Sequence, residues 1–207
     1  GVNPVMRAVF EKVIKVAPSD ANILIHGESG TGKELIARSL HVHSRRAKGP
    51  FVAVDCVALP STLLESELFG YQKGAFTGAS HNKIGLFEMA HEGTFFLDEI
   101  CELHPDLQAK LLRVLQERQF RQLGGKKLVD VDIRVISATN RDPRTAVKEG
   151  TLRHDLYYRL NVIPIYLVPL RERREDLPPL ANFFLRKFCT QNNRPLMRLS
   201  SVAIDLL

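Results

Sequence analysis

The chain has 207 residues, of which 44% are hydrophobic and 25% are charged, values typical of a globular domain. Its 29 Lys and Arg against 23 Asp and Glu give a formal net charge of +6, and their scatter favours a solvated surface over a nucleic-acid interface. No apolar run approaches ~18 residues and no signal segment begins the chain, so we expect no membrane insertion. Cys56, Cys101 and Cys189 form no CxxC pair, which predicts reduced thiols in a cytoplasmic protein.

Helical spacing of apolar residues over 5–14 is followed by a branched apolar run, 21–26, that predicts a buried strand. A glycine-rich stretch comes next, and residues 35–41 suit a helix. The stretch reads Gly27, Glu28, Ser29, Gly30, Thr31, Gly32, Lys33 and Glu34. Strand, glycine-rich loop and helix together are the context of a phosphate-binding loop, in which backbone N–H groups and Lys33 receive the phosphates.

Glu34 departs from that motif, which asks for a Ser or Thr hydroxyl to hold Mg²⁺. A chance glycine-rich turn is the alternative interpretation of the stretch, so the phosphate-loop prediction needs support further along the chain.

A second strand is predicted over 51–55, and a helix opens at 60–62, with Thr62 and Glu65 spaced as a capping box. The stretch 67–79 then surrounds Phe76 with small residues. This pattern predicts a mobile loop, unable to build a core, that presents an aromatic tip; a surface turn with a buried phenylalanine is the alternative.

Residues 93–99 predict a short apolar strand that ends in Asp98 and Glu99. The carboxyl end of a parallel strand faces the same crevice as a phosphate loop. Asp98 is therefore a candidate Mg²⁺ ligand, direct or through water, and Glu99 a candidate base for an attacking water, with a solvated acidic turn as the alternative.

A leucine stripe predicts a helix over 106–119, and Gly124 and Gly125 centre a hairpin over 120–130. The strand at 132–137 leads to Asn140, whose amide suits water or a γ-phosphate but equally a turn cap. Arg153 and Arg159 stand six apart in a helical segment, for which a plain surface helix is the simpler interpretation.

A last strand is expected over 162–167, and a helix from Pro178 carries an apolar face. We therefore divide the chain into an α/β core, 1–169, and the start of a small helical lid, 170–207. The histidines show no metal-ligand spacing.

The order of these elements suggests a P-loop ATPase of the AAA+ kind, a three-layer α/β/α fold around a parallel sheet. More narrowly, the chain resembles the central ATPase domain of bacterial enhancer-binding proteins, the activators of sigma-54 RNA polymerase. The resemblance covers essentially the whole chain. Its markers are GESGTGKE (27–34), ELFG (67–70), GAFTGA (74–79), FFLDE (95–99), ATN (138–140) and RHDLYYRLNV (153–162).

The resemblance implies ATP and Mg²⁺ as ligands, with Lys33 on the β- and γ-phosphates, Asp98 on Mg²⁺ and Glu99 activating water. Asn140 resembles a γ-phosphate sensor, and Glu34 is the family's usual residue. Arg153 and Arg159 resemble arginine fingers that reach a neighbouring subunit in a hexameric or heptameric ring. The sigma-54 contact would be the loop Gly74, Ala75, Phe76, Thr77, Gly78 and Ala79.

Two departures from the family matter. Asp55 stands where relatives usually carry Asn, which is proposed to restrain the catalytic Glu, so we expect weaker restraint of Glu99 and higher basal ATPase. The lid arginine, receiver domain and helix-turn-helix of relatives are also absent, so enhancer DNA would be bound only through a domain outside this chain.

The leading hypothesis is a ring-forming ATPase that remodels sigma-54 RNA polymerase. The alternatives are a AAA+ ATPase acting on another protein or DNA, and a nucleotide-gated binding module that has lost hydrolysis.

Overall fold

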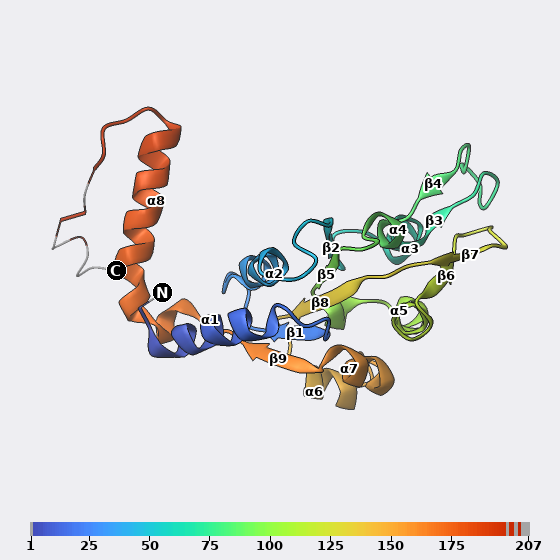
Figure 1. Ribbon diagram of the computed structural model, residues 1–207, viewed down its shortest axis with the longest axis horizontal. Coiled ribbons are helices and arrows are strands. Elements are labelled where there is room, and N and C mark those ends of the chain that lie inside the picture. Colours follow the sequence, from blue (N-terminus) through green and yellow to red (C-terminus); the bar gives the residue numbers. More distant parts are fainter. Residues whose placement is uncertain (1, 198, 201–202, 204–207) are drawn as a thin grey trace.

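The computed structural model describes residues 2–197, 199–200 and 203. A five-stranded parallel sheet lies at its centre, in the order β2–β5–β8–β1–β9 (Figure 1). The strands are β1 (Ile23–His26), β2 (Phe51–Asp55), β5 (Thr94–Asp98), β8 (Arg134–Thr139) and β9 (Ile163–Tyr166). The predicted α/β fold with a phosphate loop after the first strand is confirmed.

Helices cover both faces of the sheet, so its central strands carry apolar residues on both sides. All six residues of β8 are buried. One face packs against α1 (Pro4–Val16) and α2 (Lys33–Val42). The other packs against α3 (Ser61–Phe69), α4 (Leu86–Met89), α5 (Pro105–Glu117), α6 (Pro143–Lys148) and α7 (His154–Leu160). The result is the predicted three-layer arrangement.

Local sequence explains where the main helices begin. Asn3 caps α1 by accepting from the N–H groups of Val5 and Met6, and Pro4 supplies the fixed φ of a first helical position. The predicted leucine stripe of α5 is buried in the core. By contrast, the predicted capping box of α3 is wrong, because Pro60 occupies the cap position without a side-chain bond and Glu65 instead pairs with Lys110.

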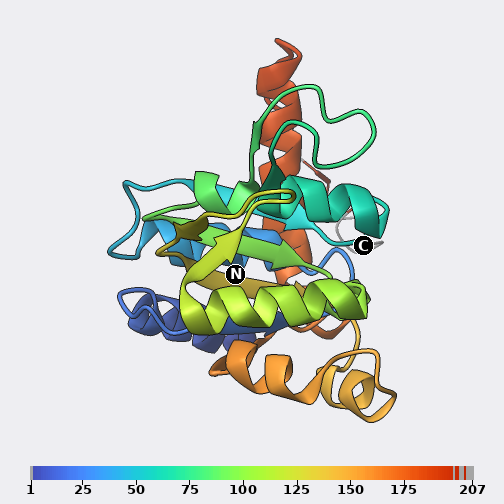
Figure 2. The same ribbon diagram turned by 90° about the vertical axis from the view of Figure 1, so that its right-hand side faces the viewer.

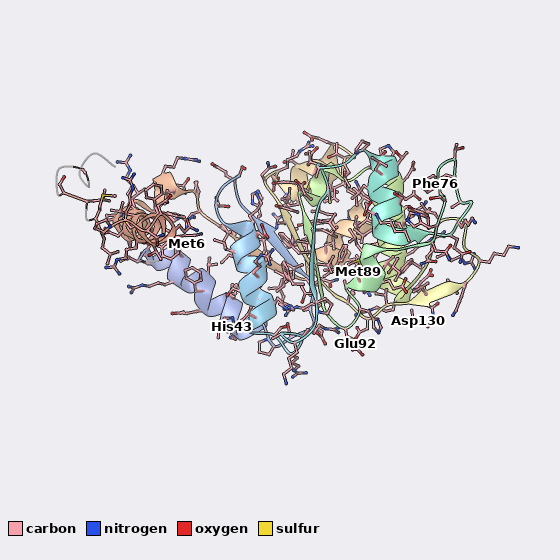
Figure 3. All side chains as sticks on the ribbon, turned by 90° about the horizontal axis from the view of Figure 1, so that it is seen from above. Met6, His43, Phe76, Met89, Glu92 and Asp130 are labelled. Atoms are coloured by element: carbon pink, nitrogen blue, oxygen red, sulfur yellow. The ribbon has the colours of Figure 1, made fainter. Side chains whose placement is uncertain are left out.

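Two short ribbons project together from one end of the molecule (Figure 1). The first pairs β3 (Gly70–Tyr71) with β4 (Lys83–Ile84), and its loop rises beyond α3 in Figure 2. The second pairs β6 (Gln119–Arg121) with β7 (Leu128–Asp130), which confirms the predicted hairpin. Seen from above, Phe76 and Met6 lie towards opposite ends of the molecule (Figure 3).

The first residues of the predicted mobile loop do contribute to the core, which corrects that prediction. Leu68 and Phe69 form the last turn of α3 and are buried. The apolar spacing of the helix continues through them, whereas the small residues begin afterwards.

At the opposite end from the ribbons, two 3₁₀ turns, η2 (Leu170–Glu172) and η3 (Arg174–Asp176), lead into α8 (Leu177–Gln191). Phe183, Phe184 and Phe188 on α8 are 60%, 59% and 51% exposed, so the apolar face predicted for this helix packs on little of the described chain. The division between core and lid at 169/170 stays a prediction, and much of 198–207 lies outside the described residues. Among the residues described, no helix is long and apolar enough to cross a membrane.

Candidate functional site

The glycine-rich stretch forms a compact loop between β1 and α2, as predicted. Gly30 and Gly32 adopt positive φ values of 79° and 97°, a conformation that glycine takes without strain. Gly32 is the cap residue of α2 and provides no side-chain hydrogen bond. The first N–H groups of α2 therefore stay available to an anion, and the helix dipole adds partial positive charge there.

Within the loop, the hydroxyl of Thr31 donates to the carbonyl of Glu28 at 2.7 Å, and Gly27 N donates to Thr139 O at 3.2 Å. Ser29 and Glu28 are exposed. Glu34 lies just inside α2 and pairs with Arg38 one turn later, at 2.7 Å. The loop is thus joined to β8 at its start and to its own helix at its end.

Lys33 is buried, with 7% of its side chain exposed, and points back across the loop. Its ammonium donates to the carbonyl of Gly27 at 3.1 Å and lies 3.1 Å from Oε1 of Glu99. The structure therefore brings the predicted phosphate-binding lysine and the predicted base into direct contact.

Asp98 ends β5, and Glu99 follows in the left-handed region with φ of 53°. Burial, and then repulsion by Glu99, raise the pKa of Asp98, while Lys33 opposes the shift. Oε2 of Glu99 accepts from the backbone N–H of Asn140 at 2.9 Å. That contact differs from the prediction for Asn140, which concerned its amide. A left-handed backbone at a non-glycine residue is strained, and such strain is common where a side chain must be aimed.

Asp55 lies opposite Asp98 in the β2–β5 register. Its Oδ1 accepts from the N–H of Val57 at 2.9 Å, closing a turn after β2. Asp55 is also among the charges that raise the pKa of Asp98. Asp55, Asp98 and Glu99 thus lie at the same edge of the sheet, but only Glu99 contacts the Lys33 ammonium, and Glu99 is held by Lys33 and the backbone of Asn140.

The donor set fits Mg²⁺ held together with phosphate oxygens. Among the described residues, no group of three or more His, Cys, Asp or Glu forms a cage for a metal ion. Mg²⁺ typically takes one or two carboxylates and completes its shell with waters and phosphates. Asp98, at the end of β5 beside Glu99, offers such a carboxylate.

Arg153 and Arg159 lie at the two ends of α7. Arg153 is the cap residue and forms a two-bond pair with Asp155, at 2.8 and 3.1 Å. Arg159 donates to the carbonyl of Leu115 at 2.9 Å and lines a groove of about 190 Å³ near the start of β1. Its own carbonyl accepts from Asn22, which precedes β1, whereas the phosphate loop follows β1. Arg159 therefore lies at the opposite sheet edge from the phosphate loop of its own chain.

The GAFTGA segment is the tip of the β3–β4 ribbon. Its turn is closed by the N–H of Gly74 donating to Ala79 O and that of Ala79 donating to Phe76 O. The Phe76 side chain is 46% exposed and packs edge-on against Tyr71, with ring centroids 5.0 Å apart. The Phe76 ring is thus partly exposed to solvent and partly covered by Tyr71, between the two predicted alternatives of an exposed tip and a buried side chain. Thr77 is exposed and Ala79 is buried.

Sequence reasoning missed two sets of contacts around these segments. Leu123 in the β6–β7 hairpin accepts from the N–H of Gln72 and donates to Gly70 O, both at 3.0 Å, so the hairpin supports the base of the GAFTGA ribbon. Arg171 pairs with Glu28 of the phosphate loop. Neither contact has a local sequence signal, although the adjacent Gly124 and Gly125 marked the hairpin tip.

Comparison with known proteins shows which family this chain belongs to. The family model described as "Sigma-54 interaction domain" matches residues 1–166. The chain belongs to this family. It is 58% identical over 205 residues to the regulatory protein AtoC of Escherichia coli, covering 99% of this chain and 44% of AtoC. It is 54% identical over 207 residues to the Nif-specific regulatory protein of Herbaspirillum seropedicae, covering 100% of this chain and 38% of that protein. This sigma-54 interaction domain thus spans less than half the length of these curated relatives.

Solved structures agree with the fold of the domain. NtrX from Brucella abortus superposes with a TM-score of 0.92 at 38% identity, covering 100% of this chain and 46% of the NtrX chain. Its complex with ATP gives a TM-score of 0.91 at the same identity and the same coverage of both chains. The P-loop NTPase domain of an Escherichia coli sigma-54 activator, at 20% identity and a TM-score of 0.56, covers 82% of this chain and 99% of its own, and supports the fold alone.

Proposed function

We propose that this domain binds ATP with Mg²⁺ and hydrolyses the nucleotide in a ring of subunits. The released energy would remodel the closed complex of sigma-54 RNA polymerase. The observation that carries the proposal is the convergence of Lys33, Glu99 and the Asn140 backbone in one hydrogen-bonded set beside Asp98. The ATP complex of NtrX, a 38% identical relative, supports the choice of nucleotide.

The residues divide the chemistry between them. The loop N–H groups and Lys33 would hold the phosphates, and Asp98 would hold Mg²⁺, which neutralises phosphate charge when bound. Glu99 would accept the proton of the attacking water as the bond to the γ-phosphorus forms and the bond to the β-phosphate oxygen breaks. Asn140 positions Glu99 through its backbone N–H, and its exposed amide is available to the γ-phosphate.

In a ring, each subunit would supply an arginine to the nucleotide site of its neighbour. Arg159 lies at the sheet edge away from its own phosphate loop, and Arg153 is exposed at the start of α7. Both therefore suit reaching a neighbouring subunit. An arginine finger is worth ~10³–10⁵ in rate where this has been measured in GTPases.

The GAFTGA loop, residues 74–79, would contact sigma-54. It projects from the end of the molecule opposite α8, and it carries the half-exposed Phe76 (Figures 1 and 3). The description of the family model and the regulatory names of the relatives support a role in transcription activation.

The test is ATP turnover against protein concentration, for the wild type and for Phe76→Ala. Turnover per subunit that rises steeply with concentration in both proteins supports fingers acting between subunits and a loop separate from the chemistry. The same pair then enters a sigma-54 open-complex assay, in which Phe76→Ala should fail. An unaffected open complex in Phe76→Ala would remove Phe76 from the sigma-54 contact, and active ATP turnover with no open complex in the wild type would favour another target protein or DNA.

Flat, concentration-independent turnover would overturn the finger assignment. Nucleotide binding without turnover at any concentration would favour the hydrolysis-deficient binding module.

A further inference from the structure

The charged segment between β9 and α8 turns back onto the phosphate loop. Arg171 in η2 donates from Nη1 to Oε2 of Glu28 at 2.6 Å and from Nη2 to Oε1 at 2.5 Å. This bidentate geometry is the strongest form of an arginine–carboxylate pair. It joins residues 143 positions apart in the chain.

Arg173 makes a second contact with the same loop. Its Nη2 donates to the carbonyl of Thr31 at 3.0 Å, and its Nε is buried without a partner among the described residues. In a trans peptide the C=O and the following N–H point in opposite directions. A bond that fixes the Thr31 carbonyl therefore also fixes the direction of the Gly32 N–H, one of the donors that a phosphate loop offers.

The segment that carries these arginines is itself anchored to the core. Asp176 is 2% exposed, and its Oδ1 accepts from the N–H of Val2 and, at 3.1 Å, from that of Asn3. Asn3 in turn donates to Glu175 at 3.3 Å. Because η3 is tied to the start of α1, the two arginines project from a fixed support onto the loop.

The negative charge of Glu28 in the phosphate loop is compensated by the positive charge of Arg171. A carboxylate in a phosphate-binding loop repels an incoming polyphosphate. The hydrogen bonds and charge of Arg171 hold the pKa of Glu28 below its usual value, so Glu28 stays ionised. Arg171 offsets that negative charge at the loop.

We propose that Arg171 and Arg173 are positioning residues for nucleotide binding, which clamp the phosphate loop from the segment that leads into α8. Arg171 neutralises Glu28, and Arg173 sets the orientation of the Thr31–Gly32 peptide. This inference rests on the proposed binding of nucleotide at the same loop.

The experiment measures ADP affinity by calorimetry on this chain, in Mg²⁺ buffer, for Arg171→Gln, Arg173→Gln and Arg174→Gln. Arg174 is the matched control because it lies in the same segment and is exposed, with no hydrogen bond to the loop among the described residues. We expect affinity to fall about threefold for Arg171→Gln and about tenfold for Arg173→Gln, and to stay unchanged for the control.

Two further readouts separate positioning from a general loss of structure. Adding Glu28→Gln to Arg171→Gln should restore affinity, because the uncompensated charge is removed. About 1 M salt should also abolish the difference between Arg171→Gln and wild type, since the pair is exposed and screened. If Arg173→Gln lowers the melting temperature, Arg173→Lys, which keeps a cationic donor, should recover both stability and affinity.

The outcomes distinguish this inference from the proposed function. If wild type does not bind ADP, or Lys33→Ala binds it as well as wild type, the proposed function fails. If Lys33→Ala loses ADP while both arginine variants bind like Arg174→Gln, the positioning role alone is overturned. Recovered stability without recovered affinity in Arg173→Lys, or no rescue by Glu28→Gln, would also contradict it.

Discussion

The phosphate-loop edge and the GAFTGA ribbon are held in opposite ways. The phosphate loop receives contacts from distant parts of the chain: Thr139 on β8, Glu99 after β5, and Arg171 and Arg173 before α8. Beyond its base, the ribbon is closed mainly by its own short contacts, such as Lys73 N donating to Asn82 at 2.7 Å. The described contacts of the phosphate loop thus come from several elements of the core, whereas those of the GAFTGA segment are mostly local.

The surroundings of one glycine in each region, Gly27 in the phosphate loop and Gly78 in the GAFTGA segment, differ in the same way. A Cβ on Gly27 would lie 2.8 Å from Oγ1 of Thr31 and 3.0 Å from Cβ of Leu167, so packing excludes any side chain there. A Cβ on Gly78 would meet nothing within 4 Å, but the backbone there has φ of +101°. The first glycine is required by neighbours, and the second by its own conformation.

The largest expected effect tests the chemistry of the phosphate-loop edge. Glu99→Gln should reduce ATP turnover by about 10²–10⁴-fold, the range for loss of a general base, while nucleotide affinity changes little. Steady-state turnover and ADP titration measure the two quantities. Glu102→Gln is the control, because Glu102 is a nearby carboxylate whose side chain pairs with Arg141 rather than with Lys33. Equal losses in both variants would contradict the assignment of Glu99.

The second prediction compares the two glycines directly. Gly27→Ala should weaken ADP binding about tenfold or more, since overpacking costs typically ~1–3 kcal/mol and the loop must move to relieve it. Gly78→Ala should leave ADP binding unchanged but impair open-complex formation, because alanine disfavours the positive φ of the loop. Loss of ADP binding in Gly78→Ala would show that the ribbon and the phosphate loop are not separable.

The third prediction concerns stability and pH at Asp98. Burial and repulsion by Glu99 raise the pKa of Asp98, so its ionised form destabilises the folded chain at neutral pH. Asp98→Asn should therefore melt a few degrees higher than wild type near pH 8 in EDTA. The gap should narrow as the pH falls through the raised pKa towards the ordinary value of 3.8, because wild-type Asp98 then becomes protonated.

Thermal melts over that range, with Asp106→Asn as an exposed control, measure the gap. A difference that grows as the pH falls would reverse the sign and contradict the argument. If Asp98→Asn hydrolyses ATP at the wild-type rate, Asp98 is not the Mg²⁺ ligand that hydrolysis requires.

Much of the fold was predictable because its signals are local. Short apolar runs predicted all five sheet strands, and the glycine-rich stretch marked the phosphate loop. The predictions that failed concern residues whose contacts lie far away in the sequence. Glu65 matched a local capping pattern, but its carboxylate is taken by Lys110, 45 positions later. The conformation of the β3–β4 ribbon depends on Leu123, which no local pattern indicates.

In the candidate site, too, features with a local sequence signal were predictable, and contacts between distant residues were not. The sequence indicated Lys33, Asp98 and Glu99 as neighbours, because parallel strands end at one sheet edge. It did not indicate that Glu99 is held by Lys33 and the Asn140 backbone, since that depends on the left-handed turn after Asp98. The contacts of Arg171 and Arg173 with the loop were equally hidden in an ordinary charged run.

The smallest expected effect tests whether Asp55 leaves Glu99 less restrained than an asparagine would. Asp55 accepts from Val57 N, and an asparagine can keep that bond through its carbonyl oxygen. Its NH₂ would then offer a donor to the carboxylates at this edge, which an ionised aspartate cannot. We therefore expect Asp55→Asn to lower basal turnover about threefold, in line with one added hydrogen bond. Asp55→Ala removes the same charge without adding a donor and should not slow turnover. If both variants slow it equally, the loss of charge rather than the donor is responsible, and the residue at this position does not restrain Glu99.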